Sequence, residues 1–244
     1  MSEQRDASGV PGTPGTPGTP GTPTELTVPV NERVGEVSAL LLRPAHARHL
    51  LLLAHGAGTD MRHHQMNATA QALAGSGIAT LRYNFPFKQH GSGRPDPAPV
   101  ATATVRAAVQ TAAAAVPDLP LLAGGRSFGG RMTSTAAAAN ALPGVRGLVF
   151  YGFPLHPAGA PGIDRAAHLA TVDVPMLFLQ GSNDTLAALA LLRPVIERLG
   201  ARATLHVVDE ADHSFHTPKR TGKTDDVVLG ELANVIAAWA ERLR

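Results

Sequence analysis

The stretch Gly124-Gly125-Arg126-Ser127-Phe128-Gly129-Gly130 contains the pattern G-x-S-x-G, with Ser127 at its centre. It follows the apolar run 119–123 and precedes the helix-like run 131–140. A serine between a strand and a helix lies in a sharp, strained turn, and small residues two positions away leave room for both elements. Its hydroxyl is then exposed at the edge of the sheet, where a base can activate it as a nucleophile. The alternative is a glycine-rich turn in which Ser127 only caps the helix.

The composition is that of a globular protein with one substantial core. The chain has 244 residues, of which 44% are hydrophobic, and its formal net charge is +2. Its basic residues are scattered rather than gathered in runs with aromatics, so we expect no nucleic-acid partner. The sequence has no cysteine, which excludes disulfides, a cysteine nucleophile and thiolate metal sites.

Residues 1–24 are expected to form a disordered tail, because glycine recurs at every third position over 9–23 with threonine and proline between. One folded domain is expected over 25–244. The first residues lack the basic and apolar regions of a signal peptide. The alanine-rich runs near 107–116 and 136–142 are too short to span a bilayer. We therefore expect a cytoplasmic protein without a membrane partner.

Apolar runs typical of strands alternate with helix-like segments through the rest of the chain. The strands are expected at 26–30, 37–42, 49–54, 78–83, 119–123, 145–151, 175–179 and 203–208. The helices are expected at 62–74, about 105–116, from 127, about 186–199 and from 224. Such alternation predicts an α/β fold, in which helices cover both faces of a parallel sheet. Functional residues of such folds lie at the carboxyl ends of the strands.

An acid and a histidine follow two later strands in the way that Ser127 follows its own. Asp184 lies in the loop after the strand ending at Leu179, and His213 lies in the loop after the strand ending at Val208. Serine needs a base because its hydroxyl is barely ionised at neutral pH. Histidine is that base, and a carboxylate fixes its tautomer and stabilises the imidazolium. The order Ser, Asp, His at one sheet edge predicts a catalytic triad.

Each member of this set has an alternative. Asp184 is also suited to capping the helix that follows it, or to forming a turn. Asp209, which closes its strand, and Asp212, which adjoins His213, are rival acids. His216 fits a rim position, or a metal ligand if a metal site exists. No H-E-x-x-H pattern or second ligand cluster is present in the sequence, so we expect no metal.

The three loops and their order resemble the α/β-hydrolase superfamily over residues 25–244. A closer resemblance is to a small branch that includes a testis-expressed hydrolase-like protein and the third subunit of the non-specific-lethal histone acetyltransferase complex. The segments that carry it are LLLAHGAG, LRYNFPF, GGRSFGGRM and DHSFHTPKR. The resemblance implies the α/β-hydrolase fold, a mostly parallel central sheet with helices on both faces.

The same resemblance implies an oxyanion hole built from two backbone amides. The loop His55-Gly56-Ala57-Gly58 follows a buried strand and would supply the amide of Ala57. The residue after the nucleophile would supply the amide of Phe128. The alternative is a plain glycine turn. His55 itself is expected to be a structural hydrogen-bonding residue.

Four aromatic residues near the expected site are candidates for an apolar substrate pocket, although they fit a buried core equally well. These are Phe85, Phe87, Phe153 and Phe215. Arg126 and Arg131 flank the expected nucleophile. Such arginines usually cover surface or pair with a carboxylate, and the alternative for Arg126 is to bind an anionic substrate.

The segment between the strand ending at Tyr151 and the next strand is short and rich in proline and glycine. It has no room for a separate lid domain. We therefore expect an open, shallow site that suits small or exposed esters better than long-chain lipids.

The sequence predicts a serine hydrolase that cleaves small carboxylic esters or thioesters through an acyl-enzyme, with no cofactor. Its expected partner is a small-molecule acyl ester, and the sequence does not show whether a protein partner exists. One alternative is a hydrolase-like binding or scaffold protein with little turnover. Another is a peptidase or acyltransferase that uses the same three residues.

Overall fold

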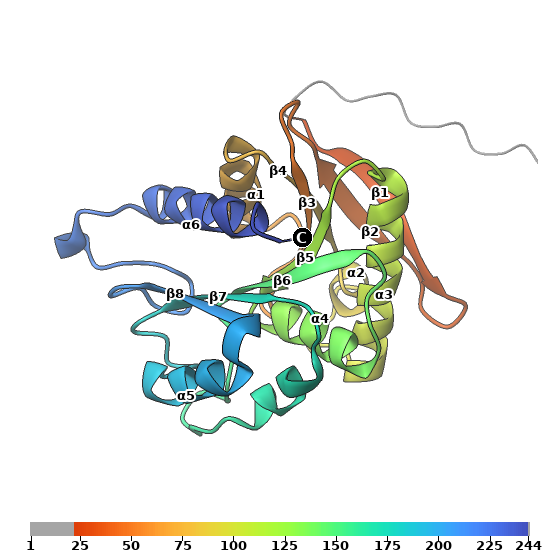
Figure 1. Cartoon of the computed structure of the whole chain (residues 1–244). Helices are drawn as coiled ribbons and strands as arrows, with labels where there is room; N and C mark the ends of the chain where they lie inside the picture. The colour runs from red at the N-terminus through yellow and green to blue at the C-terminus, as the bar shows by residue number, and fades with distance from the viewer. Residues whose placement is uncertain (1–21, 244) are drawn as a thin grey trace, which may run out of the picture.

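The computed structural model describes residues 22–243. The tail expected over 1–24 lies almost wholly outside these residues, and the first strand begins at Thr24. A central sheet of eight strands crosses the molecule, and helices lie on both of its faces (Figure 1).

The strands agree closely with the apolar runs of the sequence. They are β1 (Thr24–Asn31), β2 (Gly35–Leu42), β3 (His49–Ala54), β4 (Ile78–Tyr83), β5 (Leu121–Arg126), β6 (Val145–Tyr151), β7 (Met176–Gly181) and β8 (Ala203–Val208). Every residue of β3, β4, β5 and β7 is buried, as expected of strands covered on both faces. β1 instead alternates between exposed and less exposed residues, because it lies at the edge of the sheet.

Helices lie on both faces of the sheet. They are α1 (His64–Gly75), α2 (Pro86–Gln89), α3 (Ala98–Ala115), α4 (Phe128–Ala139), α5 (Leu189–Leu199), α6 (Asp225–Ala240) and the 3-10 helices η1 (Asp164–Thr171), η2 (Gly200–Arg202) and η3 (Lys219–Thr221). Helices α1 and α6 pack together on one face, and α3 and α4 pack together on the other (Figure 1). Within residues 22–243, no helix combines the length and apolar character that crossing a membrane requires.

The strand order is β1-β2-β4-β3-β5-β6-β7-β8. β1 and β2 run antiparallel to their neighbours, and the remaining pairs are parallel. The parallel strands therefore end at one common edge of the sheet, and the loops that follow β3, β5, β7 and β8 meet there. This arrangement confirms the α/β fold expected from the sequence.

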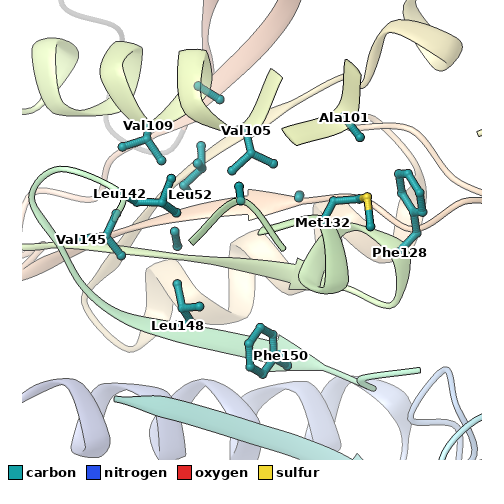
Figure 2. Close-up of a cluster of buried hydrophobic side chains, with 14 of the residues drawn as sticks. Leu52, Ala101, Val105, Val109, Phe128, Met132, Leu142, Val145, Leu148 and Phe150 are labelled. Carbon is teal, nitrogen blue, oxygen red and sulfur yellow. The ribbon is translucent and has the colours of Figure 1, made fainter. Parts of the chain in front are cut away.

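The core is divided by the sheet, because successive side chains of a strand point to opposite faces. In β3, Leu50 and Leu52 pack in the cluster beneath α3 and α4, whereas Leu51 and Leu53 pack beneath α1 and α6. Figure 2 shows side chains of α3, α4 and β6 meeting in the first cluster. The sheet is thus held rigidly from both sides, which fixes the positions of the loops at its edge.

Several elements differ from the sequence expectation: α3 begins at Ala98 rather than near 105, and α2 and η1 were not expected. Two further differences have a clear physical reason. β5 continues to Arg126, because Gly124 and Gly125 still pair with β3 and β6. α5 begins at Leu189, because Leu186 and Ala187 bond back to Asp184 in a turn. The segment between β6 and β7 contains only η1, so the described residues include no separate lid domain.

Candidate active site

Ser127 occupies the turn between β5 and α4. Its backbone has φ 48° and ψ −113°, a positive φ that non-glycine residues rarely adopt. The Ser127 amide donates to the Tyr151 carbonyl (3.1 Å), and the Ser127 carbonyl accepts from Arg131 (3.0 Å) as the helix begins. The side chain is partly exposed. The turn is therefore the strained strand-to-helix elbow that the sequence predicts.

The two glycines on either side of the elbow allow neighbouring backbones to come close. A Cβ at Gly125 would lie 2.3 Å from the Ala54 carbonyl oxygen, and one at Gly129 would lie 2.5 Å from the His55 carbonyl oxygen. Both carbonyls belong to the end of β3 or the loop after it. The glycines thus let the elbow lie directly against that loop.

Asp184 and His213 come together at the same edge of the sheet. His213 Nδ1 lies 2.7 Å from Asp184 Oδ2, and the Asp184 side chain is completely buried. The same oxygen accepts from the Gln180 side-chain amide, and Asp184 Oδ1 accepts from the Leu186 amide at 2.8 Å. These donors fix the carboxylate as an acceptor, so His213 carries its proton on Nδ1 and leaves Nε2 free to accept one.

Ser127 and His213 line one pocket of about 240 Å³, together with Leu186 and part of the 56–59 loop. The structure of residues 22–243 contains no hydrogen bond between these two side chains, a contact that commonly tightens only when substrate binds. Gly152 lies against the imidazole, because a Cβ there would be 3.1 Å from His213 Nδ1. The His213 side chain is 25% exposed, so its ring is reachable from the pocket.

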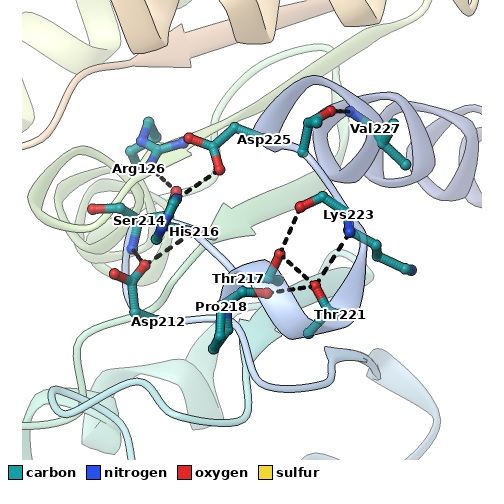
Figure 3. A network of polar contacts seen from close by, with 11 residues as sticks. Arg126, Asp212, Ser214, His216, Thr217, Pro218, Thr221, Lys223, Asp225 and Val227 are labelled. Atoms are coloured by element: carbon teal, nitrogen blue, oxygen red, sulfur yellow. Dashed lines mark hydrogen bonds and ion pairs between the residues drawn. The ribbon is translucent and has the colours of Figure 1, made fainter.

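The rival acids have other roles. Asp209 is exposed and does not bond to His213. Asp212 Oδ1 accepts from the backbone amides of Ser214 (2.7 Å) and His216 (3.0 Å), and thereby shapes the loop that carries His213 (Figure 3). His216 Nδ1 lies 2.9 Å from Asp225 Oδ1 at the surface.

The loop after β3 lies beside the elbow. Gly56 is close to Ser127, since a Cβ at Gly56 would be 3.9 Å from the Ser127 Cβ. Ala57 lines the pocket, and neither its amide nor that of Phe128 donates to a partner within residues 22–243. Within the described residues, one amide without a partner thus lies in the pocket-lining loop after β3, and a second belongs to the residue directly after Ser127.

His55 holds this loop in place and is completely buried. Its Nδ1 lies 2.8 Å from the Gly56 carbonyl oxygen, and its Nε2 accepts from the Phe85 amide at 3.0 Å. Burial lowers the pKa of His55 to about 4, so the ring is neutral at physiological pH. The ring therefore links the loop after β3 to the segment after β4.

The aromatic residues expected in a substrate pocket lie in the core. None of the four rings, Phe85, Phe87, Phe153 and Phe215, is more than 3% exposed, and none lines the pocket beside Ser127. Instead, the first two pack against His55 and Phe128 in an aromatic cluster. The pocket wall is formed by smaller and more polar groups.

Arg126 and Tyr151 belong to that wall. Sequence reasoning raised an anion-binding role for Arg126 as an alternative and gave Tyr151 no role. Both residues stand at strand ends and face each other in the register of β5 and β6. Aligning the ends of the two expected strands would have placed Tyr151 beside Arg126, and this is the signal that could have identified it.

A second serine–histidine contact exists away from this edge. Ser134 Oγ lies 2.8 Å from His168 Nε2, and the same hydroxyl donates to the Arg131 carbonyl. A hydroxyl has one proton, so when Ser134 donates it to the Arg131 carbonyl, His168 Nε2 donates to Ser134 and does not act as its base. Within residues 22–243, no carboxylate bonds to His168. The contact joins α4 to η1.

The described residues 22–243 contain no group of three or more histidine, aspartate or glutamate side chains placed to hold a metal ion. The acidic and imidazole groups at the sheet edge are engaged with one another or with backbone amides, as described above.

Comparison with known proteins agrees with this geometry. Residues 47–241 match the family described as "Alpha/beta hydrolase domain". This match spans most of the sequence, and the chain therefore belongs to the α/β-hydrolase family.

Solved structures share the fold at low sequence identity. Dienelactone hydrolase from Anabaena variabilis is 23% identical with a TM-score of 0.71, and the match covers 91% of this chain and 100% of that chain. An α/β serine hydrolase without lid from Xanthomonas campestris is 22% identical with a TM-score of 0.67, covering 93% and 97%. The esterase domain of a Rhodothermus marinus protein is 19% identical with a TM-score of 0.67, covering 91% and 99%. At these identities the likeness shows the fold alone.

Proposed function

We propose that this chain is a serine hydrolase that cleaves small carboxylic esters or thioesters through an acyl-enzyme on Ser127. The observation that carries the proposal is the bond between the buried Asp184 and His213, because His213 lines the same pocket as the strained Ser127. Buried carboxylates of this kind hold an imidazole in the tautomer that accepts a serine proton. The esterase neighbours agree with this reaction class.

In the proposed reaction, Ser127 Oγ attacks the ester carbonyl carbon while its proton moves to His213 Nε2. The carbonyl oxygen gains negative charge and is held by the amides of Ala57 and Phe128. When the tetrahedral intermediate collapses, the bond to the leaving alcohol or thiol breaks, and His213 gives the proton to that group. Water then attacks the carbonyl carbon of the acyl-enzyme while its proton moves to His213 Nε2. The bond between this carbon and Ser127 Oγ breaks, His213 returns the proton to Ser127, and the acid is released.

The size of the site supports small substrates. The pocket beside Ser127 has a volume of about 240 Å³, and within the described residues no lid domain covers it. We also propose that the chain belongs to the small branch named above, on the four sequence segments that resemble it. Peptidase or acyltransferase chemistry uses the same groups. A peptidase differs in the leaving group, and an acyltransferase differs in the acceptor of the acyl group.

A fluorophosphonate probe tests the nucleophile directly. We expect the probe to label Ser127 in the wild-type chain, as located by peptide mass mapping, and Ser127→Ala to abolish labelling. Ser134→Ala is the matched control, because it removes the other serine that contacts a histidine and should leave labelling intact.

Labelling that persists in Ser127→Ala, or its absence from the folded wild type, would contradict the proposal. In the second case, a binding or scaffold role becomes the better account of the fold.

A further inference from the structure

Arg126 is a buried arginine that has no carboxylate partner. It is 7% exposed, and it forms no ion pair with any acidic side chain of residues 22–243. Its Nη2 donates to the Ser214 carbonyl at 3.2 Å (Figure 3). Its guanidinium lies 5.9 Å from the centre of the Phe215 ring. Most buried charges are paired, because leaving one unpaired costs several kcal/mol.

The rest of this guanidinium borders the pocket beside Ser127. Arginine has five N–H groups in a planar fork, and the bond to Ser214 uses one of them. Its other nitrogens are not among the enclosed polar atoms that lack a partner. Because Arg126 lines the pocket, those N–H groups are available to a molecule bound there.

Tyr151 stands beside this arginine. The two residues are paired in the register of β5 and β6, so their side chains point to the same face of the sheet. Both line the pocket, and the Tyr151 ring also packs against Phe215 at 6.0 Å between centres. The wall next to the nucleophile therefore offers a guanidinium and a phenol.

Asp212 is the acidic side chain whose charge acts on Arg126, but it forms no ion pair with this arginine. Its carboxylate accepts from two backbone amides of its own loop. A positive charge thus remains at the pocket wall, one residue before the proposed nucleophile.

We propose that Arg126 binds a carboxylate of the substrate, so that the preferred substrates are esters that carry a carboxylate a few bonds from the scissile carbonyl. This inference rests on the proposed function and names its substrate class. A carboxylate matches the planar fork with two parallel hydrogen bonds. The small volume of the pocket places the carboxylate near the ester.

A structural role for Arg126 is the competing account. Its bond to Ser214 also holds the loop that carries His213. Loss of that role would slow hydrolysis of charged and neutral esters alike, whereas loss of a carboxylate contact would slow the charged esters selectively.

The test compares each carboxylate ester with a neutral amide of the same shape. One pair, benzyl hydrogen glutarate and benzyl glutaramate, carries the group on the acyl side. The other pair, 4-acetoxybenzoate and 4-acetoxybenzamide, carries it on the leaving group. We expect wild-type kcat/KM to favour the carboxylate by at least about tenfold in one pair, mainly through KM, and that pair identifies the side on which Arg126 binds.

Three variants complete the test. Arg126→Gln should bring the carboxylate-to-amide ratio of kcat/KM close to one, and Arg126→Lys should retain part of the preference. Arg131→Gln is the matched control, because Arg131 lies one helical turn beyond the nucleophile and does not line the pocket. It should keep the wild-type ratio.

Ratios near one in both pairs of wild-type substrates would overturn the inference, as would an equal loss for both members of a pair in Arg126→Gln. If that variant does not fold, the wild-type ratios and Arg126→Lys decide the question. Failure of the proposed function looks different, because the probe would then not label Ser127 and none of the four esters would be hydrolysed.

Discussion

Ser127, Asp184 and His213 stand at three different strand ends, and each is held by its local backbone. The elbow holds Ser127 in a rare conformation, two further donors fix the Asp184 carboxylate, and Gly152 supports the imidazole. Gly152 adopts φ +67° and lies in van der Waals contact with the His213 ring. A side chain at this glycine would displace the imidazole from its carboxylate.

Gly152→Ala is therefore expected to reduce the rate of fluorophosphonate labelling of Ser127 by at least about tenfold, because small displacements of a base are costly. Gly159→Ala is the control, since Gly159 has a similar φ of +73° and a Cβ added there would meet nothing within 4 Å. Both variants should lose about 1 kcal/mol in urea unfolding from backbone strain. Equal labelling rates in the two variants would show that Gly152 does not support His213.

For single residues, the sequence predicts the place in the fold better than the direction in which the side chain points. Ser127, Asp184 and His213 follow strands, and the strand ends of a parallel sheet meet, so their proximity was predictable. The rings of Phe85 and Phe153 also follow strands, yet they turn into the core. An apolar side chain in a loop fits either place, and only the packing of its neighbours decides.

In the unit formed by β5 and α4, the absence of a side chain at a glycine allows the helix to pack closely against the end of β3. At Gly129, in the first turn of α4, an added Cβ would lie 2.5 Å from the His55 carbonyl oxygen. At Gly230, within α6, an added Cβ would meet nothing within 4 Å. The same substitution at the two helical glycines should therefore have opposite effects.

We expect Gly129→Ala to lower the free energy of unfolding by about 2 kcal/mol, because it forces α4 away from the end of β3. Gly230→Ala should raise it by about 0.5–1 kcal/mol through helix propensity. Urea unfolding followed by circular dichroism measures both changes. A neutral or stabilising result at Gly129 would mean that the contact between α4 and the β3 loop is not tight.

Elements with strong apolar patterns were predictable to the residue, as β3, β4, β6 and β8 show. The carboxyl end of β5 was not, because glycines in a sequence indicate a turn, whereas here Gly124 and Gly125 continue the strand. The short helices α2 and η1 were also missed. These helices contain too few residues for a periodic pattern of apolar residues to be recognised.

Across the molecule, burial lowers the pKa of several histidines. Burial lowers the pKa of His55 to about 4, and it also lowers the pKa values of His49 and His168. In the unfolded chain such a ring takes up its proton near pH 6.5. Between these pH values the unfolded state binds more protons, so the free energy of unfolding falls as the pH decreases.

For His55 alone, this loss should approach about 3 kcal/mol between pH 7 and pH 4. Urea unfolding across this range should give a flatter pH dependence for His55→Gln than for the wild type. His46→Gln serves as the control, because His46 is exposed, and should match the wild-type slope. Parallel curves for the wild type and His55→Gln would show that folding does not lower the pKa of His55.

The proposed site takes its nucleophile from the end of β5 and its acid and base from the ends of β7 and β8. A chain is synthesised from its N-terminus, so β5 leaves the ribosome well before β8. The growing chain therefore exposes Ser127 while the partners that would activate it are still to be made. If the first strands fold early, Ser127 lacks its proposed partners, and the proposed hydrolytic activity requires that the C-terminal part of the sheet has been added.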